Sequence, residues 1–272
     1  MKAHKIAGGG GVQLNVVEQG NLQGRPILFI HGTSQCWLQW SRQMDSKLAG
    51  DYRLVAMDMR GHGLSDKPRD AYGDAKLWAD DVHAVIKALN LDHPVLSGWS
   101  YGPLVILDYI RHYGDDQIGG IQFVGGITKL GSEDAFAVFT PGILGVMGDL
   151  LATDAEASVR GLQGLLRLCF AQELSAPELY LMLGYNVAVP PYVRQALFSR
   201  SFGNDDLLPK IRRPVLLTHG AADAVVKSAA VDQHKALMPH AQVQLIANAG
   251  HAAFWDDAPT FNAGLHTFCK GL

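Results

Sequence analysis

The 272-residue sequence has few charged residues, few cysteines and no long apolar run. Charged side chains make up 18% of it and hydrophobic ones 48%, a composition that excludes an intrinsically disordered chain. The 23 basic and 26 acidic residues nearly cancel, and no Lys/Arg cluster occurs, so we expect neither nucleic acid nor an anionic membrane as a partner. No apolar stretch reaches the roughly 20 residues that span a bilayer.

The three cysteines are also too few and too scattered along the sequence to form a disulfide framework. Cys36, Cys169 and Cys269 fit neither a disulfide scaffold nor a paired metal motif, so we expect reduced thiols. The first eleven residues lack the apolar core of a secretory signal, which favours a cytoplasmic protein. No histidine–carboxylate cluster has metal-ligand spacing, and no phosphate loop or dinucleotide fingerprint follows a strand. We therefore predict no metal and no cofactor.

What the sequence does contain is an alternation of strand-like and helix-like segments. Short apolar runs predict strands at 12–19, 26–32, 52–58, 94–99, 118–127, 214–220 and 243–248. Helical patterns predict helices at 74–90, 104–113, 228–238 and from about 259 onward. Such alternation indicates an α/β fold, with a mostly parallel sheet of about eight strands covered by helices on both faces.

The alternation stops between residues 128 and 210. This stretch has helical signals at 155–170 and 176–183 but no clear strand. We therefore predict one α/β core, residues 1–127 and 211–272, interrupted by a helical cap, residues 128–210. A second irregular feature, the run Gly8–Gly11, is expected to be a flexible turn.

The strongest chemical signal is Gly98-Trp99-Ser100-Tyr101-Gly102, between a predicted strand and a predicted helix. This is the context of a G-x-S-x-G nucleophile elbow, in which a serine sits on a strained turn above the sheet. Residues two positions to either side must be small because the backbone doubles back there. The amino terminus of the following helix favours developing negative charge near the serine.

A serine hydroxyl needs a general base, and the base needs an orienting acid. Asp223 lies just past the strand 214–220, and His251 just past the strand 243–248. All three candidates therefore fall at the carboxyl edge of one sheet, where open α/β sheets bind ligands. Glu133 or Asp134, which follow the strand before the insertion, are alternative acids.

The segments FIHGT, DMRGHGLSDKP, GWSYG, LLTHGAAD and NAGH resemble the α/β-hydrolase fold superfamily, of the capped serine esterase, lactonase and perhydrolase type. The resemblance implies that Ser100 is the nucleophile, His251 the general base and then acid, and Asp223 the orienting carboxylate. It also implies an oxyanion hole formed by the backbone N–H groups of Thr33 and Tyr101. Such donors stabilise the charge that grows on the carbonyl oxygen.

Other residues have open roles at this stage. The Tyr101 phenol could narrow the acyl site or donate a hydrogen bond, and Trp37 and Trp40 could line a pocket or pack a helix on the sheet. In the resemblance, Asp58 and Arg60 brace a turn and carry no chemistry.

The predicted function is hydrolysis of small to medium, largely uncharged esters or lactones. We expect Trp37, Tyr101 and Met147 to contact the substrate, with apolar cap residues as the roof of the pocket. Perhydrolysis and carbon–carbon bond hydrolysis use the same triad and remain alternatives. A ligand receptor with an intact hydrolase pocket is the alternative from another class.

Overall fold

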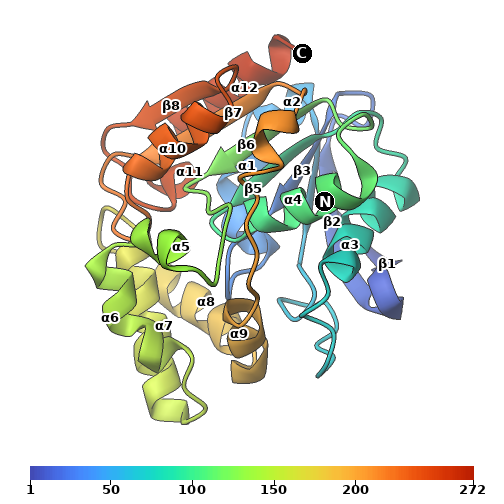
Figure 1. The fold of residues 1–272 in the computed structure, drawn as a ribbon. Helices are drawn as coiled ribbons and strands as arrows, with labels where there is room; N and C mark the ends of the chain where they lie inside the picture. Colours follow the sequence, from blue (N-terminus) through green and yellow to red (C-terminus); the bar gives the residue numbers. More distant parts are fainter.

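A computed structural model describes residues 1–272, and its centre is an eight-stranded sheet (Figure 1). The strand order is β1-β2-β4-β3-β5-β6-β7-β8. The strands are β1 (Lys2–Ala7), β2 (Gln13–Gly20), β3 (Pro26–Ile30), β4 (Arg53–Met57), β5 (Val95–Trp99), β6 (Gly120–Val124), β7 (Val215–Gly220) and β8 (Gln242–Ile246). The β1–β2 and β2–β4 pairs are antiparallel and the others are parallel. The predicted, mostly parallel sheet is confirmed.

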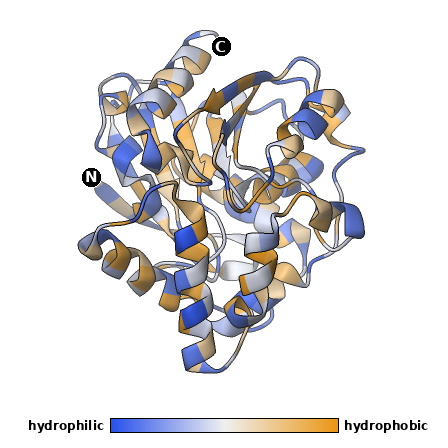
Figure 2. Cartoon of the chain, turned by 90° about the vertical axis from the view of Figure 1, so that its left-hand side faces the viewer, coloured by the Kyte–Doolittle hydropathy of each residue, from blue (hydrophilic) through white to orange (hydrophobic).

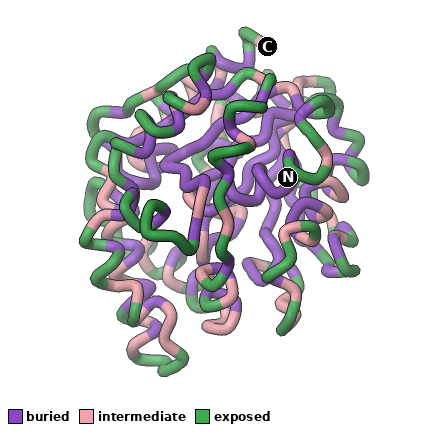
Figure 3. Tube along the Cα trace, viewed as in Figure 1, coloured by how far each residue is buried: buried purple, intermediate pink, exposed green.

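Four adjacent strands inside the sheet are buried along their whole length. Every residue of β3, β5, β6 and β7 is buried, although successive side chains point to opposite faces of a sheet. Both faces must therefore be covered, as continuous apolar runs in a parallel sheet predict. Figure 2 shows the hydrophobic residues concentrated in these strands, and Figure 3 shows the buried residues running through the same region.

Helices cover the sheet on both sides. The core helices are α1 (Ser41–Met44), α2 (Leu48–Asp51), α3 (Ala75–Ala88), α4 (Gly102–Tyr113), α10 (Ala229–Leu237), α11 (Ala253–Asp256) and α12 (Ala258–Lys270). Helices α3 and α4 pack side by side, and α1 packs with α11 and α12 (Figure 1). Helix α3 begins at Asp74, whose side chain accepts the N–H of Lys76 and caps the first turn.

A group of helices is inserted between β6 and β7. It comprises α5 (Glu133–Ala137), α6 (Pro141–Leu150), α7 (Ala155–Cys169), α8 (Ala176–Val187) and α9 (Pro191–Phe198). Helices α6 to α9 lie together at one end of the molecule (Figure 1), which confirms the predicted helical insertion. Its domain limits at 128 and 210 stay a prediction. No helix of the chain is both long and apolar enough to cross a membrane.

Two features at the amino terminus differ from the sequence-based expectations. Strand β1 was not predicted because half of its sequence, KAHKIA, is polar and most of it is exposed, as an edge strand can be. The run Gly8–Gly11 is anchored at Gly9, which is buried in a short 3₁₀ turn. The Gly9 N–H donates to Asp81 over 2.9 Å, and its carbonyl accepts from Arg60 over 2.9 Å. The run is therefore a turn, as expected, but one that is tied to the core at Gly9.

Candidate active site

The turn between β5 and α4 brings Ser100 to the carboxyl edge of the sheet. Ser100 has a φ of 57°, a left-handed conformation that is rare for residues other than glycine. A Cβ at Gly98 would lie 2.7 Å from the carbonyl carbon of Gly102, and one at Gly102 would lie 2.5 Å from the carbonyl oxygen of Ile30. Only glycine fits at both positions, which explains the spacing of the motif.

Backbone hydrogen bonds hold the strained turn in place. The Ser100 N–H donates to the carbonyl of Val124 over 2.9 Å, and the Ser100 carbonyl accepts from the N–H of Ile127 over 3.1 Å. Val124 is the last residue of β6, the neighbouring strand, and Ile127 lies three residues beyond it. Strain at such a position persists only where the surroundings over-determine the conformation.

His251 and Asp223 lie in the loops after β8 and β7. The Nδ1 of His251 donates to Oδ2 of Asp223 over 2.8 Å, and both side chains are about 1% exposed. The other carboxylate oxygen of Asp223 accepts the N–H groups of Val225 and Val226, each at 2.8 Å. The carboxylate is thus fixed by the loop and in turn fixes the imidazole ring.

The charge state of Asp223 follows from these contacts. Burial favours the neutral carboxyl group, but the charge and hydrogen bond of His251 outweigh it and hold the pKa of Asp223 below its usual value. His219 lies on the same carboxylate, with its Nε2 3.4 Å from Oδ2 of Asp223. Burial lowers the pKa of His219, and its Nε2–H donates to the carbonyl of Val226. The lowered pKa disfavours a positive charge on His219, and His251 is the side chain that hydrogen-bonds to Asp223.

Gly125 is a site residue that the sequence-based analysis missed. It follows β6 with a φ of 49°. A Cβ at this position would lie 2.9 Å from Nδ1 of His251 and 3.3 Å from Oδ2 of Asp223. The space beside the His251–Asp223 hydrogen bond therefore requires glycine. The doublet Gly125-Gly126, which lies inside the predicted strand 118–127 and just beyond the observed end of β6, was the available signal.

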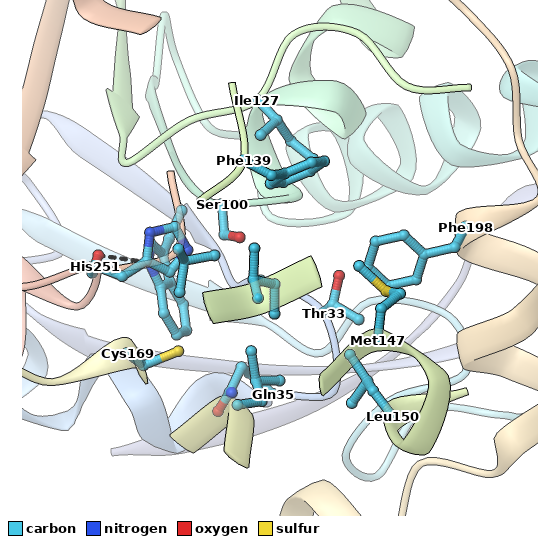
Figure 4. A pocket seen from close by; sticks show the side chains of 15 residues that line it. Thr33, Gln35, Ser100, Ile127, Phe139, Met147, Leu150, Cys169, Phe198 and His251 are labelled. Atoms are coloured by element: carbon cyan, nitrogen blue, oxygen red, sulfur yellow. Dashed lines mark hydrogen bonds between the residues drawn. The ribbon is translucent and has the colours of Figure 1, made fainter. Parts of the chain in front are cut away.

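Ser100 and His251 line the same cavity but are not hydrogen-bonded to each other. The Nε2 atom of His251 is buried and has no hydrogen-bond partner. Ser100 is half-buried, and its hydroxyl lies on the cavity side of the elbow (Figure 4). Hydrogen bonds between catalytic groups are often absent in substrate-free proteins and tighten when substrate binds. The free Nε2 is the atom available to take a proton.

The two backbone amides expected to form the oxyanion hole are both unpaired. Neither the N–H of Thr33 nor that of Tyr101 donates to any acceptor in the protein. The Thr33 loop is held from behind by His31, whose Nδ1–H donates to the carbonyl of Gly32 and whose Nε2 accepts the N–H of Met59. Burial lowers the pKa of His31 to about 4, so its ring stays neutral and keeps both bonds near neutral pH.

The cavity above Ser100 is largely apolar, and no Asp, Glu, Lys or Arg side chain lines its wall. Figure 4 shows Met147, Leu150 and Phe198 on the side opposite His251. The cap and the core both contribute to the lining, which consists of Gly32, Thr33, Gln35, Trp99, Ser100, Ile127, Phe139, Ile143, Met147, Leu150, Leu165, Cys169, Phe198, Val225 and His251. Met147 thus lies where we expected a substrate contact.

Trp37 and Tyr101 do not line this cavity, contrary to the expectation that both contact substrate. Trp37 is partly buried against the core, and its backbone N–H donates to Asp58. The Tyr101 side chain is fully buried, and its hydroxyl donates to the carbonyl of Leu197. The phenol therefore neither narrows the cavity nor reaches a substrate in it.

The other residues considered for the site in the sequence analysis lie outside the cavity wall. Trp40 packs in the core with its ring 4.3 Å from that of Phe254. The Glu133 and Asp134 side chains are exposed on α5 and make no contact with His251. Arg60 is buried and forks onto Asp81, so it braces its turn as the resemblance implied.

Comparison with known proteins places the chain in a family. Residues 25–258 match the family model described as the alpha/beta hydrolase fold. The protein belongs to this family.

Three relatives illustrate the likeness. The crystal structure of the esterase RhEst1 from Rhodococcus sp. ECU1013 is 32% identical over the full length of both chains, with a TM-score of 0.92. The AB hydrolase superfamily protein YisY of Bacillus subtilis is 28% identical over 257 residues, which cover 90% of this chain and 91% of the relative. The esterase EaEST from Exiguobacterium antarcticum shares the fold at 23% identity, covering 99% of this chain and all of that one, with a TM-score of 0.87.

Proposed function

We propose that the protein is a serine hydrolase that cleaves small to medium, uncharged carboxylic esters or lactones through an acyl-enzyme intermediate. The observation that carries this proposal is that Ser100 and His251 line one cavity while Asp223 holds the His251 ring. Ser100 lies on a strained elbow, and His251 lies beside it with a free Nε2. Asp223 holds the other nitrogen of that ring at 2.8 Å. The likeness to the esterase RhEst1 supports the same reaction class.

The geometry supports a two-step acyl transfer. Oγ of Ser100 attacks the ester carbonyl while Nε2 of His251 takes its proton. The oxyanion then accepts from the unpaired N–H groups of Thr33 and Tyr101. The protonated His251, stabilised by Asp223, donates its proton to the leaving alcohol. Water activated by the same Nε2 hydrolyses the acyl-enzyme and frees Ser100.

The wall of the cavity supports an uncharged substrate. Apart from His251, its side chains are apolar or neutral, so a charged acyl or alcohol group would lose hydration without gaining a partner. An alkyl or aryl group can instead pack against Phe139, Met147 and Phe198. This is the composition of a site that binds apolar groups and orients one carbonyl.

A substrate panel on the wild-type protein and Ser100→Ala tests the proposal. We expect the wild type to hydrolyse p-nitrophenyl acetate and butyrate and simple lactones, and Ser100→Ala to lose this turnover while keeping its circular dichroism spectrum. Wild-type turnover in folded Ser100→Ala would exclude the proposed nucleophile. In a second assay, the protein is incubated with acetate, hydrogen peroxide and bromide, and bromide oxidation reports perhydrolysis. Bromide oxidation faster than ester hydrolysis would replace the proposed reaction with perhydrolysis.

A further inference from the structure

Behind the elbow lies a buried ion pair that the proposed acyl transfer does not use. Arg200 follows α9, at the point where the chain returns from the inserted helices to the core, and its side chain is 2% exposed. Its Nη2 donates to Oδ2 of Asp108 over 2.7 Å, and its Nη1 donates to the hydroxyl of Tyr101 over 3.1 Å. The guanidinium also lies over the rings of Trp78 and Phe202, at 5.3 and 4.4 Å.

Stability alone is a weak reason for this arrangement. Burying an arginine and a carboxylate costs hydration that their attraction often only balances, so apolar residues of similar size would serve the core as well. The fork of the guanidinium, however, fixes two groups relative to each other. Here it joins Tyr101 and Asp108, which lie about two turns apart along the start and the middle of α4.

Tyr101 directly follows Ser100, and its backbone N–H is one of the two unpaired amides expected to form the oxyanion hole. Its ring is fully buried, and its hydroxyl accepts from Arg200 and donates to the carbonyl of Leu197 over 3.4 Å. Leu197 belongs to α9, as does Phe198, which lines the cavity. The phenol thus connects the amide donor to the inserted helix that forms part of the wall.

We propose that Arg200 is a positioning residue for acyl transfer: by holding the Tyr101 phenol against α4 and α9, it fixes the backbone N–H of Tyr101 where the oxyanion develops. This rests on the proposed hydrolase function. The effect belongs to the transition state, because a ground-state carbonyl carries little charge for the donor to meet. Loss of the contact should therefore lower kcat and leave KM nearly unchanged.

Two mild variants separate this role from a structural one. Tyr101→Phe removes the hydroxyl and keeps the ring and the Arg200–Asp108 pair. Arg200→Lys keeps the charge beside Asp108 but lacks the fork that reaches both partners. Tyr192→Phe is the matched control, because its hydroxyl donates to the carbonyl of Lys67 over 2.7 Å, joins α9 to the core and lies outside the cavity wall.

The measurements are kcat and KM for p-nitrophenyl butyrate and the inhibition constant of an alkyl trifluoromethyl ketone, which forms a tetrahedral oxyanion adduct on a serine. We expect Tyr101→Phe and Arg200→Lys each to lower kcat and ketone affinity by about 10-fold, or about 1.4 kcal/mol, with KM within about 2-fold. The double variant should be no worse than either single one, since both act through the same phenol. Tyr192→Phe should leave kcat and ketone affinity unchanged.

Unchanged kcat and ketone affinity in Tyr101→Phe would overturn the positioning role. Losses that multiply in the double variant would also overturn it, because they would show that Arg200 acts by a route other than Tyr101. Neither result touches the proposed function, which depends on the loss of turnover in Ser100→Ala. If Arg200→Lys does not fold, Tyr101→Phe against Tyr192→Phe decides the question alone.

Discussion

The indole N–H of Trp99 donates to the backbone carbonyl of His251 over 2.9 Å. Trp99 directly precedes Ser100, and its ring lies 5.4 Å from the imidazole ring of His251. The residue before the proposed nucleophile therefore anchors the loop that carries the proposed base. The elbow therefore helps to position both partners of the proposed proton transfer, Ser100 and His251.

Trp99→Phe should test this anchor. Removing a buried hydrogen bond of about 1 kcal/mol should loosen the His251 loop and lower kcat for p-nitrophenyl butyrate about 5-fold. Trp40→Phe is the control, because it removes the same atoms from the core while Nε1 of Trp40 has no hydrogen-bond partner. Equal kcat losses in the two variants would show that core volume, and not the anchor, matters.

Gly125→Ala should damage the site more than the fold. The new methyl group would lie 2.9 Å from Nδ1 of His251, and a φ of 49° disfavours alanine. A small displacement of the imidazole costs about 100-fold in rate, so we expect kcat/KM to fall by about that factor. Gly50→Ala, with open space around the new methyl group, should leave kcat/KM unchanged. Full activity in Gly125→Ala would contradict the described contact.

Asp223→Asn should distinguish Asp223 from the alternative acids Glu133 and Asp134. Without the carboxylate, the His251 ring loses its orientation and the partner of its positive charge, a loss of about 10³ to 10⁴ in kcat. The exposed pair Glu133→Gln and Asp134→Asn should have no effect on kcat in the same assay. The opposite pattern, with activity lost only in the α5 variant, would move the acid to that helix.

Acid should destabilise the protein through its buried histidines. Burial lowers the pKa of His31 and of His234 from 6.5 to about 4, so the folded protein binds these protons only near pH 4, whereas the unfolded chain binds them near pH 6.5. The contribution of these two buried histidines to the free energy of unfolding should therefore be fully present above pH 6.5. It should fall as the pH drops to 4, by up to about 3 kcal/mol for each histidine.

Urea unfolding between pH 8 and pH 4 measures this effect. His234→Gln, which can still reach Thr128, should flatten the slope below pH 6.5. The exposed His240→Gln should keep the wild-type slope. An unchanged slope in His234→Gln would show that this histidine does not supply the pH dependence.

The sequence predicted the parts of the site that depend on local chain geometry. The elbow was recognisable because Gly98 and Gly102 meet backbone within a few ångströms, a constraint that a short motif expresses. The positions of Asp223 and His251 followed from the ends of two strands that alternation made visible. The unpaired amide of Thr33 lies in the loop after β3, and that of Tyr101 lies in the elbow between β5 and α4.

The sequence could not predict contacts between distant segments. The direction of the Tyr101 side chain depends on Arg200, which lies 99 residues away, and no pattern near the elbow indicates that partner. Gly125 is required by the His251–Asp223 pair, whose ring and carboxylate reach it from other loops. Strand β1 escaped prediction because an exposed edge strand needs no apolar alternation.

The central claim is that Ser100 is a nucleophile activated by His251, and covalent labelling tests it most directly. The protein is treated with a fluorophosphonate, and intact mass, the mass of the modified peptide and p-nitrophenyl butyrate turnover are followed together. We predict one adduct per chain on Ser100, formed in proportion to the loss of turnover and absent in Ser100→Ala. Full labelling of Ser100 with turnover retained, or inactivation with Ser100 unmodified, would contradict the account.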